Sequence, residues 1–119
     1  MIDTGRNYLT TTTIKMALDA MAYTKLNLLH WHIVDDQSFA LKSETLPRLA
    51  GDGAFSPKHT YSIADVKSIV AYARDRGIAV LPGMLAAIPC VHSMRELNLN
   101  RFLSELNTTP VVRARLSWP

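Results

Sequence analysis

The chain has 119 residues, the length of a single domain, and its hydrophobic content of 48% is ordinary for a globular protein. The formal net charge of +3 is spread over lysines and arginines that do not cluster, which does not indicate a nucleic-acid-binding protein. The single cysteine, Cys90, excludes an internal disulfide, and no apolar run approaches the ~18 residues of a membrane span.

The chain is predicted to begin with the end of a strand and then a helix. Residues 1–9, MIDTGRNYL, fit the last part of a strand. Arg6 follows a glycine turn that would let its guanidinium reach a site, the ordinary alternative being a solvated surface arginine. The threonines at 10–13 are candidate N-caps, and an amphipathic helix to about Thr24 is predicted from a stripe of apolar residues: Ile14, Ala17, Leu18 and Met21.

The segment 25–37, KLNLLHWHIVDDQ, contains no glycine or proline and is predicted to be a buried strand that ends in charge. Alternation places His30 and His32 on one face, and Trp31 with Asp35 on the other, so that Asp35 and Asp36 point in opposite directions. Ligands of parallel α/β sheets and barrels bind at the carboxyl ends of strands, which makes either aspartate a candidate site residue. The alternative is that both carboxylates only cap the following loop.

A long connection and a second helix–strand unit follow. Residues 38–61 are predicted to be a loop with a short helical turn near 46–49. Ser62 and Asp65 resemble a capping box, Gly77 is placed to end the helix, and the apolar run 78–81 is predicted to be a second buried strand. The alternation of strands and helices predicts an α/β fold with parallel strands, either a (β/α)8 barrel or a doubly wound sheet.

The character of the sequence changes after Pro82. A third amphipathic helix is predicted from Leu99, Phe102, Leu103 and Leu106, and the rest of the tail has no clear period. The chain is therefore divided into a barrel-like part, residues 1–82, and a divergent tail, residues 83–119. A complete (β/α)8 barrel needs about 250 residues, so this chain would hold less than half of one.

Three stretches resemble the start of the catalytic barrel of family 20 glycoside hydrolases, the β-N-acetylhexosaminidases. They are Asp3-Thr4-Gly5-Arg6-Asn7-Tyr8-Leu9, Met21-Ala22-Tyr23-Thr24-Lys25-Leu26-Asn27 and His30-Trp31-His32-Ile33-Val34-Asp35-Asp36-Gln37-Ser38-Phe39. The close of the second predicted helix, Tyr72-Ala73-Arg74-Asp75-Arg76-Gly77-Ile78, is also similar to the family. The resemblance covers roughly residues 1–82 and implies a partial TIM barrel with its first two to three βα units.

The resemblance implies hydrolysis of terminal N-acetylglucosamine or N-acetylgalactosamine from glycans, with retention of configuration. In this family the acetamido oxygen of the substrate replaces an enzyme nucleophile. By the same resemblance, Arg6 would bind sugar hydroxyls, and Asp35 would support a histidine that contacts the general acid. No metal or other cofactor is implied. Relatives are expected in the lysosome or outside the cell, and no signal peptide is found in this chain.

The sequence also departs from the family pattern. The family continues Pro-Glu-x-Asp-x-Pro-Gly-His after the second complete strand, whereas this chain reads Pro82-Gly83-Met84-Leu85-Ala86-Ala87-Ile88-Pro89. The adjacent Asp-Glu pair that supplies the general acid has no counterpart, because none of the three glutamates, Glu44, Glu96 and Glu105, follows an aspartate. The chain is therefore predicted to be an inactive fragment, and a truncated or misspliced gene model or a frame change near Pro82 would explain the tail.

Two other functions are compatible with the residues. His30 and His32 share a strand face, and this His-x-His pattern also occurs in metal-dependent hydrolases, although histidines packed in a core are the simpler interpretation. A non-catalytic partial barrel that pairs with another chain is the second alternative, because an incomplete sheet leaves strand edges unpaired. The oligomeric state is left open.

Overall fold

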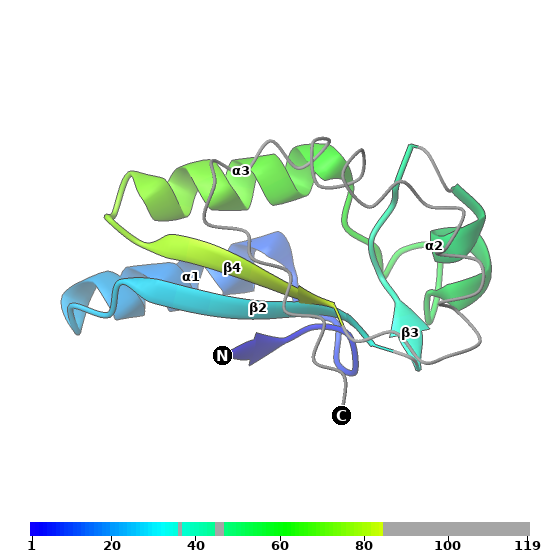
Figure 1. The fold of residues 1–119 in the computed structure, drawn as a ribbon, viewed down its shortest axis with the longest axis horizontal. Coiled ribbons are helices and arrows are strands. Elements are labelled where there is room, and N and C mark those ends of the chain that lie inside the picture. The colour runs from blue at the N-terminus through cyan, green and yellow to red at the C-terminus, as the bar shows by residue number, and fades with distance from the viewer. Residues whose placement is uncertain (36, 45–46, 85–119) are drawn as a thin grey trace, which may run out of the picture.

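The computed structural model describes residues 1–35, 37–44 and 47–84, which contain four strands and three helices (Figure 1). In chain order the elements are β1 (Ile2–Asp3), α1 (Thr11–Tyr23), β2 (Leu28–Asp35), β3 (Ser38–Phe39), α2 (Pro47–Gly53), α3 (Ile63–Arg74) and β4 (Ala79–Met84). The third helix predicted near Leu99 and the whole tail from residue 85 lie outside the described residues.

Strand β2 is the centre of the sheet, because it pairs with each of the other three strands. It pairs in parallel with β1, where Ile2 is opposite Trp31, and in parallel with β4, where Leu28 is opposite Ala79. Trp31 also pairs with Pro82, so β1 and β4 occupy opposite edges of β2. The prediction that these three strands, β1, β2 and β4, run parallel is confirmed.

Strand β3 makes the sheet mixed, which the expectation of purely parallel strands did not include. Val34 is paired with Phe39 and Asp35 with Ser38 in antiparallel register. Only residues 36–37 separate β2 from β3, and a connection of that length is too short for the crossover that parallel pairing requires. The connection that was predicted to be mainly loop therefore contains both a short strand and the helix α2.

The two long helices begin where their capping residues predict. The Thr10 side chain accepts a hydrogen bond from the Thr13 amide at the start of α1. At the start of α3, the Asp65 amide donates to Ser62 Oγ and the Ser62 amide donates to the Asp65 carboxylate, which is a complete capping box. These hydrogen bonds satisfy amides that have no partner within a helix, so both starts are set locally.

One face of β2 forms the core together with α1 and α3. Leu29, Trp31 and Ile33 are buried and belong to one cluster with apolar residues of both helices, among them Ile14, Leu18, Val66 and Ile69. His30 and His32 lie on the opposite face and are only partly buried. The two-residue alternation predicted for this strand is thus confirmed as far as Ile33.

Polar side chains also join α1 to the end of α3. Arg76 Nε donates to Asp19 Oδ1 at 2.6 Å, and the Tyr72 hydroxyl donates to the same carboxylate at 3.0 and 3.1 Å. The Arg76 guanidinium lies 3.4 Å from the centre of the Tyr72 ring, a cation–π arrangement. This cluster holds the two helices together on the outer side of the core. Within the part of the chain that the structure describes, none of the helices has the length and apolarity needed to cross a membrane.

Candidate active site

A tight turn after β1 brings Arg6 to the carboxyl end of β2. The amides of Gly5 and Arg6 both donate to Asp3 Oδ1 at 3.1 Å, and the Thr4 amide donates to the His32 carbonyl at 2.8 Å. A Cβ on Gly5 would lie 2.9 Å from the Asp35 nitrogen, closer than real Cβ atoms approach backbone. The turn can therefore lie against β2 only with glycine at this position.

The Arg6 guanidinium is bound by carboxylates from two strands. Its Nη2 and Nε lie 2.5 and 2.7 Å from Asp3 Oδ2, and its Nε lies 3.4 Å from Asp35 Oδ2. Burial opposes the charge of Asp3, but the hydrogen bonds from Arg6 outweigh it and lower the pKa of that carboxyl. With 56% of its side chain exposed, Arg6 remains accessible to a ligand from solvent.

Asp35 is almost fully buried, with 7% of its side chain exposed, and its Oδ2 lies 3.1 Å from His32 Nε2. Strict alternation predicted that Asp35 would share the face of Trp31, and this prediction is wrong. Between His32 and Val34, β2 advances by two residues while its partner β4 advances by only one. β2 therefore contains a bulge. The extra residue changes the phase of the alternation and directs Asp35 to the histidine side.

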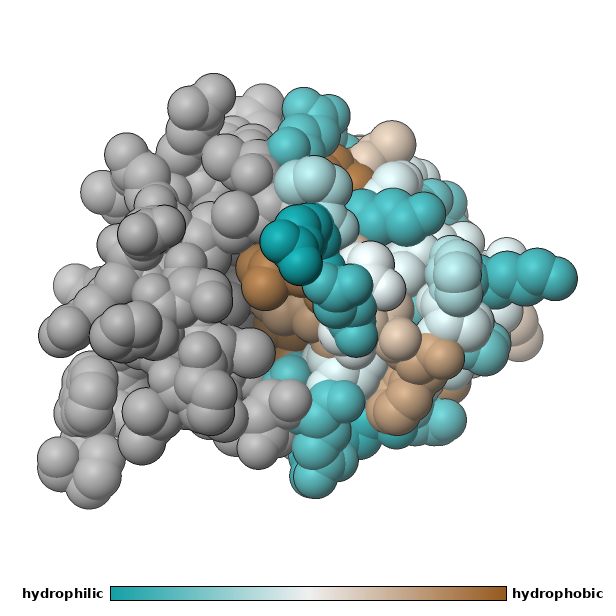
Figure 2. Space-filling view, turned by 90° about the vertical axis from the view of Figure 1, so that its right-hand side faces the viewer, coloured by the Kyte–Doolittle hydropathy of each residue, from teal (hydrophilic) through white to brown (hydrophobic). Residues whose placement is uncertain are grey.

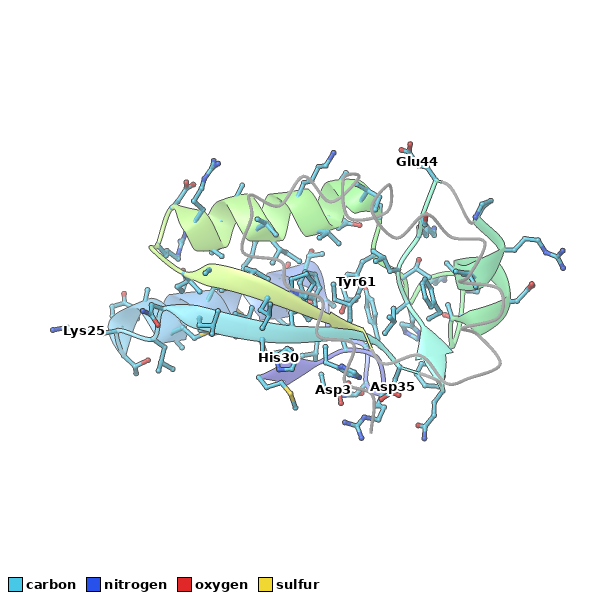
Figure 3. All side chains as sticks on the ribbon, viewed as in Figure 1. Asp3, Lys25, His30, Asp35, Glu44 and Tyr61 are labelled. Atoms are coloured by element: carbon cyan, nitrogen blue, oxygen red, sulfur yellow. The ribbon has the colours of Figure 1, made fainter. Side chains whose placement is uncertain are left out.

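Figure 3 shows Asp3 and Asp35 side by side at the carboxyl end of β2, with His30 farther back along the strand. Glu44, the only glutamate among the described residues, is exposed and points away from them. Of the residues predicted from sequence, Arg6 and Asp35 are thus brought together, and within residues 1–35, 37–44 and 47–84 no aspartate is followed by a glutamate.

Sequence reasoning did not identify Asp3 and His32 as partners of this cluster. Asp3 could have been found from the Asp-Thr-Gly-Arg order, because an aspartate two residues before a glycine commonly accepts hydrogen bonds from the turn that follows it. The His32 contact depends on the bulge, for which the sequence of β2 alone carries no signal.

The proposed His30/His32 metal pair finds little support in the geometry of the described residues. No group of three or more histidine, cysteine or acidic side chains is arranged there to hold an ion. His32 uses Nε2 to contact Asp35, and the ring of His30 occupies the space that a side chain at position 83 would need. Both histidines are therefore explained by packing and by the contact with Asp35.

Known proteins with similar sequences are glycosidases. The family model described as "Glycosyl hydrolase family 20, catalytic domain" matches residues 1–95. Beta-hexosaminidase subunit beta of Homo sapiens is 54% identical over 82 residues, and that of Mus musculus is 52% identical over the same length. Each alignment covers 69% of this chain and 15% of the relative.

Solved structures agree with these matches. A chitobiase from Flavobacterium johnsoniae superposes with a TM-score of 0.65 at 34% identity, covering 70% of this chain and 12% of its own. A β-N-acetylhexosaminidase from Bacteroides fragilis superposes with a TM-score of 0.62 at 37% identity, covering 68% of this chain and 18% of its own.

The α/β fold and these matches define part of a glycosidase catalytic domain. The chain belongs to glycoside hydrolase family 20. It spans about 15% of the length of the curated relatives that it matches. The predicted family is confirmed.

Proposed function

We propose that residues 1–82 are the opening part of the (β/α)8 catalytic barrel of a β-N-acetylhexosaminidase, and that residues 83–119 are a divergent tail. Strands β1, β2 and β4 would be the first three barrel strands, with α1 and α3 as the crossovers between them. The parallel pairing of β2 with both β1 and β4 supports this assignment, since barrel neighbours pair in this way. The alignments to the relatives are 82 residues long, and the family model matches residues 1–95, which extends past the proposed boundary.

The substrate in this proposal is a glycan that ends in N-acetylglucosamine or N-acetylgalactosamine, and Arg6 binds hydroxyls of that terminal sugar. The cluster of Arg6 with Asp3 and Asp35 at the carboxyl ends of β1 and β2 is the observation that carries the proposal. A guanidinium is a fork of donors suited to two adjacent oxygens, and the two carboxylates fix its position. By family, the complete protein would act in the lysosome or outside the cell.

Asp35 is proposed to be a positioning residue. Its carboxylate contacts both Arg6 and His32 but is 93% buried by its surroundings, too enclosed to bind a sugar directly. It would hold the guanidinium in place and, in the complete family site, orient a histidine beside the general acid. The position that matches that family histidine, Pro89, lies outside the described residues.

The chain alone is proposed to be inactive. In the substrate-assisted reaction, the acetamido oxygen forms a bond to the anomeric carbon while the bond to the leaving oxygen breaks. The leaving oxygen must take a proton from a general acid, and water later opens the cyclic intermediate with retention of configuration. The adjacent Asp-Glu pair that would supply this proton is missing from the sequence.

The test is hydrolysis of a chromogenic N-acetylglucosaminide by the purified, folded 119-residue chain, with Asp35→Asn and Arg6→Ala variants as comparisons. We expect all three proteins to release chromophore at the rate of buffer alone. If the wild-type chain hydrolysed the substrate and either substitution abolished this activity, an acid would be present. That result would contradict the proposed inactivity.

The proposed role of Arg6 has a separate readout, which does not need catalysis. Binding of N-acetylglucosamine should be detectable by NMR titration of the wild-type chain and be lost in Arg6→Ala. Unchanged binding in Arg6→Ala would contradict that role. Arg48→Ala is the matched control, because Arg48 is an exposed arginine on α2.

A further inference from the structure

Ser38 is a buried polar residue in the hairpin that joins β2 to β3, and only 2% of it is exposed. Among the residues that the structure describes, Ser38 Oγ is the one buried side-chain nitrogen or oxygen without a hydrogen-bond partner. Burying a hydroxyl without a partner costs free energy, and in native proteins such groups commonly bind an ordered water. A bound water is therefore the simplest partner for this hydroxyl.

The residue directly opposite Ser38 is Asp35, which belongs to the candidate site. The two are paired in antiparallel register, and paired residues project their side chains to the same face of a sheet, with Cβ atoms about 4.5–5.5 Å apart. Figure 3 shows Asp35 where β2 ends beside β3. At this separation one water can bridge a hydroxyl and a carboxylate.

Neighbouring segments cover both residues. The turn after β1 lies on Asp35, because a Cβ on Gly5 would be 3.2 Å from the Asp35 Cβ. The end of α2 lies against β3, because a Cβ on Gly53 would be 2.9 Å from the Phe39 Cβ. Figure 2 looks onto the side of the molecule that carries α2, where hydrophilic and apolar side chains form the surface. A water between Ser38 and Asp35 would therefore be an internal part of the structure.

We propose that Ser38 is a positioning residue of the candidate site, and that it acts through a water bound between its hydroxyl and the Asp35 carboxylate. The water donates one hydrogen bond to the carboxylate and a second hydrogen bond joins it to Ser38 Oγ. An ionised carboxylate has about four acceptor positions, so this bond adds to the contacts of Asp35 with His32 and Arg6. The inference rests on the proposed role of Asp35 in holding the Arg6 guanidinium. Through this water, β3 helps to keep the carboxylate turned toward both partners.

The first test is a crystal structure of the folded 119-residue chain at a resolution that shows ordered waters. We expect one water within about 3.2 Å of both Ser38 Oγ and a carboxylate oxygen of Asp35. A direct hydrogen bond between the two side chains, or no water in contact with Ser38 Oγ, would overturn the proposal. This test needs no variant, so it decides the matter even if substitutions at Ser38 prevent folding.

The second test asks whether the water positions Asp35. His32 donates its Nε2 proton to Asp35, since a carboxylate can only accept, and NMR measures how fast this proton exchanges with solvent. We expect exchange to be about 5-fold faster in Ser38→Ala, the factor that corresponds to the loss of one hydrogen bond. Ser38→Thr keeps the hydroxyl and should keep the slow exchange.

Ser43→Ala is the matched control, because Ser43 is a second buried serine, 4% exposed, that is not paired with Asp35. It should leave the exchange of the His32 proton unchanged. Unchanged exchange in Ser38→Ala, or equal acceleration in Ser43→Ala, would overturn the positioning role.

Neither test involves a sugar, so the outcomes separate this inference from the proposed function. Loss of N-acetylglucosamine binding in Arg6→Ala, together with no water at Ser38, would support the proposed function and overturn the inference. A water at Ser38 and faster exchange in Ser38→Ala, together with unchanged sugar binding in Arg6→Ala, would support the inference and contradict the proposed role of Arg6.

Discussion

The Tyr61 side chain and the Leu9 backbone exchange two hydrogen bonds across 52 residues of sequence. The Leu9 amide donates to the Tyr61 hydroxyl at 3.2 Å, and that hydroxyl donates to the Leu9 carbonyl. Leu9 belongs to the loop after β1, and Tyr61 belongs to the segment before α3. The buried Tyr61 ring therefore fixes the loop that carries Arg6. The stability of the candidate site is therefore tied to a residue that does not contact it.

We expect Tyr61→Phe to lower the free energy of unfolding by about 1–3 kcal/mol, because the Leu9 amide and carbonyl would lose their shared partner in a partly buried environment. Urea unfolding monitored by circular dichroism measures the change. Tyr23→Phe is the control and should shift stability by less than about 0.5 kcal/mol, since Tyr23 is exposed. Equal effects of the two substitutions would contradict this role of Tyr61.

The same residue predicts a loss of stability at high pH. Burial raises the pKa of Tyr61 from 10.0 to about 12, with the hydrogen bond to Leu9 acting in the opposite direction. Since the folded state holds the phenol proton more tightly, this contribution is complete below pH 10 and is lost as pH rises toward 12. The unfolding free energy of wild type minus that of Tyr61→Phe should therefore decrease between pH 10 and 12, and a constant difference would contradict the prediction.

Gly5 and Gly51 should respond oppositely to alanine. At Gly5 the new Cβ would meet the backbone of Asp35 and Val34 at 2.9 and 3.0 Å, and backbone atoms cannot move aside without shifting β2. We expect Gly5→Ala to destabilise the fold by about 1–3 kcal/mol. Gly51 lies within α2 with nothing within 4 Å of its Cβ position, so Gly51→Ala should stabilise by up to about 1 kcal/mol. Thermal unfolding of both variants checks the pair, and a loss of stability at Gly51 as large as at Gly5 would contradict it.

The capping box of α3 predicts that Ser62→Ala costs about 1 kcal/mol, because the Asp65 amide loses its acceptor. Ser62→Thr keeps the hydroxyl and should retain most of the stability. The hydrogen bonds from Ser62 lower the pKa of Asp65. In wild type, the stability that the Asp65 carboxylate contributes should therefore be lost only in strongly acidic solution, as pH falls through its folded-state pKa. Chemical unfolding at neutral pH separates the variants, and equal losses in both would show that the hydroxyl is not the important group.

The sequence allowed the local parts of this fold to be predicted. Helices α1 and α3 were expected because their caps and apolar stripes lie within a few residues of each other. Strands β2 and β4 were expected from their apolar runs. Strand β3 has only two residues, and its pairing with β2 is set by a reversal of the chain that no periodicity signals. The bulge that turns Asp35 toward His32 depends likewise on the partner strand β4.

The candidate site was predictable in its members but not in its contacts. Arg6 and Asp35 were named from resemblance to a family, and the structure brings them within 3.4 Å of each other. The role of Asp3 as the nearer partner of Arg6 depends on the conformation of one turn. A pocket beside Arg6 that Phe55 also lines joins two loops about 50 positions apart, which only the folded chain can reveal.

The cluster that joins α1 to α3 also bears on how this part of the protein is made. Arg76 and Asp19 are 57 positions apart, and Tyr61 and Leu9 are 52 apart, so contacts between residues far apart in sequence join the first part of the unit to its later part. Long-range contacts of this kind require large loops to close before they stabilise anything, which slows folding. During synthesis, β1, α1 and β2 emerge from the ribosome before the residues that hold them together. We expect this unit to acquire protease resistance in one step, after Arg76 has left the exit tunnel.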